Sequence, residues 1–130
     1  MSNSVQSLWP TTIGAKPLPA PVRLLGQQGV ALKEVTNGRL YGEVIQPTLR
    51  SGNGFVYDFY VGVTDKPFRH KLLSIEFGYL FDYPVVIQNH EAATTVRVAD
   101  EKAFREELRN LLNSHVTQEL LGRLLAVTGS

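Results

Sequence analysis

The clearest pattern in the chain is a period of two between residues 55 and 63, where large apolar side chains occupy every odd position. Such alternation is typical of a β-strand that buries one face. It predicts that Phe59 and its odd-numbered neighbours point into the core, whereas Tyr60 and its even-numbered neighbours point outward. Short apolar runs bounded by turn residues predict further strands at residues 40–46, 69–77, 85–88 and 94–98.

Spacings of three and four residues predict a helix on each side of these strands. Pro21 suits the first turn of a helix, and Asn37-Gly38 is typical of a helix end. Between them lies one apolar stripe, formed by Val22, Leu25, Gly29, Leu32 and Val35. After the strands, Asp100 is a good N-cap for a second helix, and Ser114 or Thr117 can cap a third.

Short connections between successive strands favour an antiparallel meander. We therefore expect an α+β two-layer sandwich: a meander of four to five strands, with one N-terminal helix and two C-terminal helices packed on one face. Residues 1–20 contain three prolines and no apolar period, so they are predicted to form a tail whose Leu8, Trp9 and Ile13 pack against the body. Residues 21–130 are expected to form a single domain.

Composition excludes several classes of protein. The 130 residues carry 13 basic and 12 acidic side chains, a net charge of +1, so the chain has no one-sided positive field of the kind that nucleic-acid binders use. It has no cysteine, which excludes disulfides and thiolate zinc sites and fits a reducing compartment. We find neither a secretory signal nor an apolar run of membrane-spanning length, and therefore expect a cytoplasmic protein that does not bind membranes.

The predicted outward face of the sheet mixes apolar and charged groups. Tyr60 and Leu72 lie there among Asp58 and Glu76, a combination typical of a contact surface rather than of a fully solvated face. A second copy of the chain is one partner that such a face can bind, because a two-fold axis uses the same patch twice.

The loop 77–84 is unusually aromatic, although loops are mostly polar. It contains Phe77, Tyr79, Phe81 and Tyr83, and such residues are enriched at the centres of protein interfaces. We therefore predict a non-enzymatic protein-interaction module, of accessory, adaptor or immunity type. It would bind a protein partner, or itself as a homodimer, through the outward sheet face and this loop.

One alternative starts from the string Gly26-Gln27-Gln28-Gly29, followed by Lys33. The string resembles the G-x-x-G loop of KH domains, and the resemblance implies binding of nucleic-acid phosphates by the loop backbone. The glutamines and the lack of a preceding strand and helix favour a different interpretation. In that interpretation the string belongs to a helix with two small residues at its packing face.

A second alternative is a small-ligand binder or enzyme that uses Asp58, His70 and Glu76. By strand parity all three are predicted to share the outward sheet face, and a histidine near carboxylates is typical of acid–base or metal chemistry. However, His70 and Glu76 lie six residues apart on one strand, roughly 20 Å by strand rise, so they cannot act on one atom. We therefore expect no catalytic residue, no metal and no other cofactor.

Overall fold

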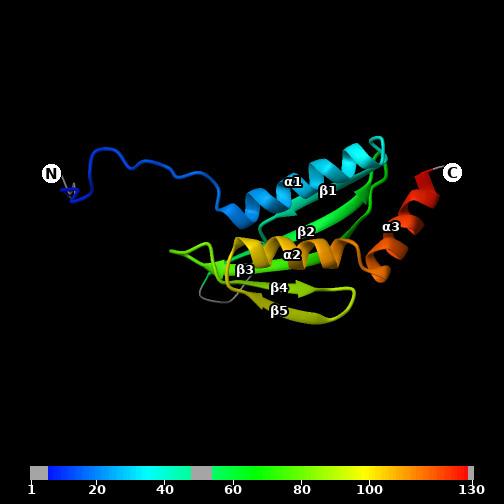
Figure 1. Cartoon of the computed structure of the whole chain (residues 1–130). Helices are drawn as coiled ribbons and strands as arrows, with labels where there is room; N and C mark the ends of the chain where they lie inside the picture. The colour runs from blue at the N-terminus through cyan, green and yellow to red at the C-terminus, as the bar shows by residue number, and fades with distance from the viewer. Residues whose placement is uncertain (1–5, 48–53, 129–130) are drawn as a thin grey trace.

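The computed structural model describes residues 6–47 and 54–128. Its elements are, in chain order, α1 (Ala20–Val35), β1 (Leu40–Ile45), β2 (Gly54–Val63), β3 (Arg69–Gly78), β4 (Val85–Asn89), β5 (Thr94–Val98), α2 (Glu101–Leu112) and α3 (His115–Thr128). The five strands form one antiparallel sheet in sequential order, and the helices pack on one of its faces (Figure 1). The predicted α+β fold is confirmed, with five strands in the meander.

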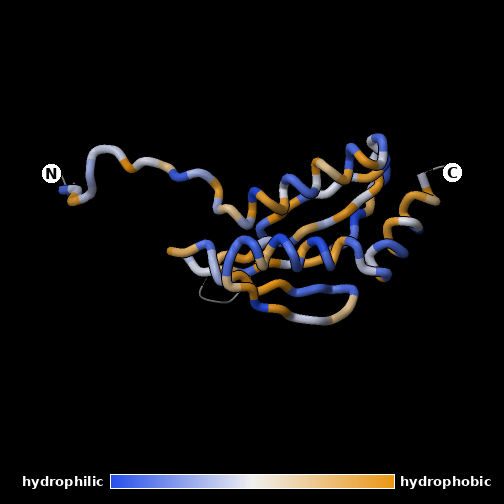
Figure 2. The backbone as a smooth tube through the Cα atoms, in the orientation of Figure 1, coloured by the Kyte–Doolittle hydropathy of each residue, from blue (hydrophilic) through white to orange (hydrophobic). Residues whose placement is uncertain are grey.

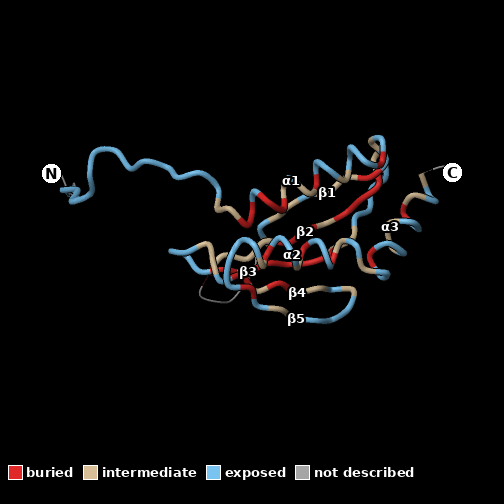
Figure 3. Tube along the Cα trace, in the orientation of Figure 1, coloured by how far each residue is buried: buried red, intermediate tan, exposed pale blue. Residues whose placement is uncertain are grey.

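The core lies between this sheet and the helical layer, as Figure 3 shows by the buried stretches of β2 and β3. Phe59 on β2 is only 2% exposed, and Val61 and Val63 are also buried, whereas Tyr60 is half-buried on the other face. Phe104 of α2 is fully buried in the same core. The predicted alternation of β2 is therefore confirmed, and burial of these large side chains is the main term that holds the two layers together.

The helix α1 ends as its sequence predicts but buries a different stripe. Asn37 and Gly38 both have positive φ, and the Gly38 N–H donates to the Lys33 carbonyl at 2.8 Å, which closes the helix. Leu24 joins the buried face, whereas Val35, predicted as its last member, is exposed.

A β-bulge changes the predicted parity of β3. Phe59 is opposite Leu73, but Tyr60 is opposite Lys71, so Leu72 is one extra residue on β3. Leu72 is 1% exposed and lies with Phe59 under the helices, and His70 is opposite the core residue Val61. The prediction that Leu72 and His70 lie on the outward face is therefore wrong, because the extra residue reverses the alternation.

The two C-terminal helices are separated by a sharp break. Asp100 caps α2 by accepting from the Ala103 N–H at 2.8 Å, as predicted. Ser114, not Thr117, caps α3, because its hydroxyl oxygen accepts from the Thr117 N–H. The break turns α3 away from the line of α2 (Figure 1), and the helical layer remains open between α1 and α3.

The N-terminal segment 6–19 has no regular secondary structure and projects away from the body (Figure 1). Leu8, Trp9 and Ile13 are 94%, 76% and 72% exposed, so the prediction that they pack against the body is wrong. Residues 1–5 of the predicted tail lie outside the described residues. Within residues 6–47 and 54–128, no helix combines the length and apolar character that crossing a bilayer requires.

Candidate functional site

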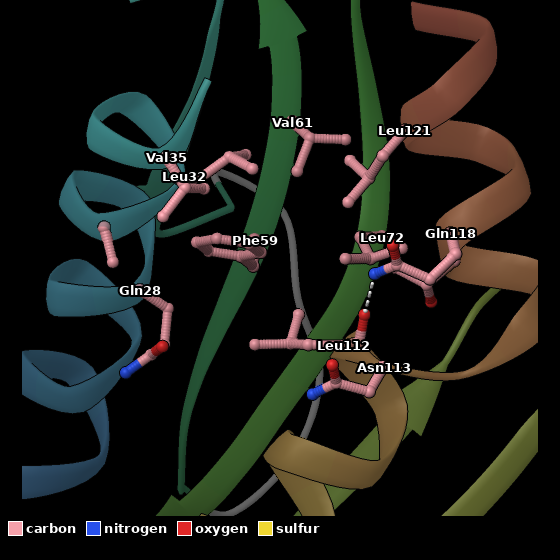
Figure 4. Close-up of a pocket in the computed structure, with 12 residues that line it drawn as sticks. Gln28, Leu32, Val35, Phe59, Val61, Leu72, Leu112, Asn113, Gln118 and Leu121 are labelled. Atoms are coloured by element: carbon pink, nitrogen blue, oxygen red, sulfur yellow. Dashed lines mark hydrogen bonds between the residues drawn. The ribbon is translucent and has the colours of Figure 1, made fainter. Parts of the chain in front are cut away.

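An apolar groove opens into the helical layer between α1 and the C-terminal helices (Figure 4). Its floor is made by Phe59 and Val61 of β2 and Leu72 of β3. One wall is formed by Leu32 and Val35 of α1, and the opposite wall by Leu112 of α2 and Leu121 of α3. The hollow has a volume of about 210 Å³.

Two local features of the chain create this groove. The bulge turns Leu72 toward the helices and thereby adds an apolar side chain to the floor. The break at Asn113-Ser114 lets α3 diverge from the line of α2, and a hollow remains between α1 and α3 above the sheet. A continuous helix from Glu101 onward would follow the line of α2 instead.

Three polar residues that line the groove, Asn113, Thr117 and Gln118, form hydrogen bonds within the protein. Gln118 donates from Nε2 to the Leu112 carbonyl at 2.9 Å, as Figure 4 shows. Thr117 is fully buried, and its hydroxyl lies 3.1 Å from that of Ser114. None of the described residues that line the groove is titratable. The groove therefore offers apolar surface and no charge.

A second hollow of about 240 Å³ continues the groove between α1 and α2. The two hollows share Gln28, Leu112 and Asn113, and they lie in line along successive turns of α1. Each is smaller than the roughly 300–1,000 Å³ of typical small-molecule pockets. Two small hollows in a row suit a chain segment that places one side chain in each.

The outward sheet face differs from its prediction because most of its charged side chains are paired within the protein. Asp58 is 6% exposed, accepts from the Ser74 hydroxyl at 2.6 Å and has the Lys71 ammonium at 3.6 Å. Arg69 lies 4.6 Å from the centre of the Tyr60 ring and pairs with Glu43 of β1 at 3.1 Å. Most charges on this face are thus matched by neighbours in the same molecule, which leaves less for a partner to bind.

The residues of the predicted acid–base cluster do not come together. Asp58 and the exposed Glu76 lie on the outward face, whereas His70 lies on the helix side and contacts Glu91. The sequence prediction also missed His90, whose Nε2 lies 2.9 Å from the Ser74 hydroxyl.

Asp58, Ser74 and His90 form a series of two hydrogen bonds whose donors can be assigned. Because Ser74 donates its only proton to Asp58, the His90 nitrogen must donate to the Ser74 oxygen. In a Ser-His-Asp triad the imidazole removes the serine proton. The His90 imidazole cannot do so in this arrangement. These three residues therefore form a structural hydrogen-bond network in this geometry.

The aromatic loop divides into an anchored and an exposed part. The Tyr83 ring packs edge-on against Phe104, and Tyr79 packs edge-on against Phe55 at 4.9 Å. The tip residues Leu80 and Phe81 are 87% and 74% exposed. Burial, with Glu101 and Asp82 nearby, raises the pKa of Tyr83 to about 12.

The Gly26–Gly29 string lies inside α1, as the helical interpretation expected. A helix uses its backbone N–H groups internally, so the open loop implied by the KH resemblance is not present. Gly29 is buried against β1, Gln28 borders the groove, and Gln27 and Lys33 are exposed. The nucleic-acid alternative thereby loses the backbone site on which it depended.

Within the described ranges, no group of three or more histidine, aspartate and glutamate side chains is placed to hold a metal ion. Comparison of the chain with protein-family models, curated proteins and solved structures finds no match.

Proposed function

We propose that this protein is a non-enzymatic interaction module that binds a short apolar segment of another protein molecule in the groove between α1 and α3. The observation that carries the proposal is the apolar groove, whose walls expose Val35 and partly expose three leucines above the buried floor, and which a second hollow extends along α1. Apolar surface that stays open in a folded protein is typical of a binding site.

The groove also indicates the chemistry of the segment. A charged side chain placed there would lose its hydration and find no opposite charge among the described lining residues of the first hollow. The segment should therefore present uncharged apolar side chains to the groove. Arg105 and Arg109 border only the second hollow, and Arg105 already pairs with Glu101.

The loop tip is a second proposed contact. The Asp82 carboxylate accepts from the Ala20 N–H at 3.2 Å, which holds the tip beside the start of α1. Leu24, which lines the second hollow, lies about one turn further along the same helix. A segment that leaves the groove in this direction approaches Leu80 and Phe81. A contact of Tyr60 and Glu76 with a partner stays a prediction, as does a cytoplasmic location.

A displayed library of random short peptides tests the groove without knowledge of the natural partner. We expect selection on the full chain to enrich uncharged peptides with two or more large apolar residues. Ala31→Glu places a carboxylate at the groove and should abolish their binding, because Ala31 is exposed and lines the hollow. Val30→Glu is the matched control, since Val30 is exposed next to it and does not line either hollow.

Enrichment of charged peptides would contradict this proposal, as would the absence of any enrichment. Equal binding to the Ala31→Glu variant and to the wild type would show that peptides bind elsewhere. Circular dichroism of both variants verifies that each retains its helices, which is expected for substitutions at exposed helix positions.

A further inference from the structure

The N-terminal segment carries exposed apolar side chains. Leu8, Trp9 and Ile13 are mostly exposed, and Figure 2 shows hydrophobic positions along an otherwise polar tail. Residues 6–15 include no charged side chain. Tryptophan is enriched at protein interfaces, where it contributes a large contact area. The segment thus has the chemistry that the groove accepts.

The junction with α1 directs this segment away from its own groove. Pro17, Pro19 and Pro21 alternate there, and Pro19 has φ −55° and ψ 146°, the polyproline II geometry. Proline-rich segments of this kind act as semi-rigid spacers. The tail leaves the body at the start of α1 and projects away from it (Figure 1), whereas the first hollow is lined by the later turns of that helix and by α3.

The spacing along the segment matches the spacing of the two hollows. Leu24 lines only the second hollow and Leu32 only the first, and they lie eight residues, about 12 Å, apart along α1. Trp9 and Ile13 lie four residues apart, about 13 Å in an extended chain. From Leu8 to Ala20 an extended chain spans up to roughly 40 Å, which exceeds the diameter of a small domain.

We infer that the occupant of the groove is the N-terminal segment 6–15 of a second copy of this chain, with Trp9 and Ile13 as its two anchors. This inference rests on the proposed function of the groove. Two copies that exchange their segments across a two-fold axis would cover both grooves and close as a dimer.

The experiment uses the tryptophan itself, because Trp9 is the only tryptophan in the chain. Fluorescence and light scattering are measured over a dilution series of the full-length protein. We expect the emission of Trp9 to shift to shorter wavelength, and its quenching by acrylamide to fall, over the same concentrations at which the mass doubles. An emission shift that is independent of concentration, in a protein of monomer mass, would overturn the second copy as the occupant.

Two variants separate the segment from the groove. Trp9→Ala and Ala31→Glu should each weaken self-association by about tenfold or more, as loss of an interface anchor does. When the two variants are mixed, one intact segment meets one intact groove, so the Trp9 emission of the Ala31→Glu chain should shift again. Val30→Glu and Tyr60→Asp should both associate as the wild type does.

The outcomes distinguish this inference from the function on which it rests. If the mass stays that of a monomer and Trp9 stays exposed, while library peptides still bind the groove, only the second copy is excluded. If Tyr60→Asp dissociates a dimer and Trp9→Ala does not, the interface is the outward sheet face and the inference is wrong. If Ala31→Glu changes neither peptide binding nor self-association, the groove itself is not a binding site.

Discussion

Gly29 of α1 lies directly against Gly42 of β1. A methyl group built on Gly29 would come within 2.5 Å of the Gly42 carbonyl oxygen, and one built on Gly42 would lie 2.6 Å from the Gly29 Cα. The two glycines therefore let the helix backbone touch the strand backbone at this point. This close approach places α1 over the first strands and sets one wall of the groove.

The two glycines of α1 should respond to alanine in opposite directions. Gly29→Ala forces backbone atoms apart and should lower the free energy of unfolding by about 2 kcal/mol or more. Gly26→Ala meets nothing within 4 Å and should raise it by up to about 1 kcal/mol, because alanine favours the helix. Urea unfolding of both variants measures this difference. An equal effect of the two substitutions would contradict the close contact with Gly42.

The fold was largely predictable because local signals and long-range packing agree. The alternation in β2, the Asn37-Gly38 helix end and the Asp100 cap each act over a few residues and appear directly in the sequence. Strand parity alone does not predict the bulge, because a regular alternation through β3 places Leu72 on the outward face. The adjacent pair Leu72-Leu73 was the available signal, since two consecutive buried side chains cannot lie in a regular strand with one buried face.

Phe59→Ala tests the central role of the inward row of β2. Phe59 is almost fully buried and also forms the groove floor, so its truncation should lower the free energy of unfolding by about 3–5 kcal/mol. Val56→Ala on the opposite face of the same strand is the control, and should cost well under half as much because Val56 is only half-buried. Chemical denaturation measures both. A cost below about 1 kcal/mol for Phe59→Ala would contradict the observed packing.

The candidate site was less predictable than the fold. The groove arises where the ends of α1, α2 and α3 diverge above the bulge, and no single stretch of sequence records that arrangement. Leu72 and Phe81 are predicted from the sequence as partner-binding residues, but the prediction places Leu72 on the wrong face of the sheet. Pairing of Asp58 with Ser74 and Lys71 depends on strand register, which becomes visible only in the folded chain.

Tyr83→Phe should stabilise the protein. The Tyr83 hydroxyl is buried and has no hydrogen-bond partner among the described residues, so its removal relieves a desolvation penalty of about 1 kcal/mol. The phenylalanine ring keeps the edge-on contact with Phe104. Thermal and urea unfolding at neutral pH measure the gain. A loss of stability in this variant would show that the hydroxyl is satisfied in solution.

The same variant should change how stability depends on alkaline pH. Burial, with Glu101 and Asp82 nearby, raises the pKa of Tyr83 from 10.0 to about 12, so the folded chain keeps this proton where the unfolded chain loses it. The part of the free energy of unfolding that depends on this proton is therefore present in full below pH 10 and is lost as pH rises through about 12. The advantage of Tyr83→Phe over the wild type should widen across this window. A constant difference would show that the pKa of Tyr83 is not raised.

Asp82→Ala tests whether a residue far along the chain caps α1. Pro19 precedes the helix and makes no side-chain cap, whereas the Asp82 carboxylate accepts from the Ala20 N–H. Loss of this acceptor and of its charge near the helix N-terminus should lower the free energy of unfolding by about 1 kcal/mol. Asp82→Asn keeps an acceptor oxygen and should lose less. The alanine variant should also speed amide exchange at Leu80 and Phe81, because the contact holds the loop tip beside α1. Unchanged exchange there would mean that Tyr79 and Tyr83 alone position the tip.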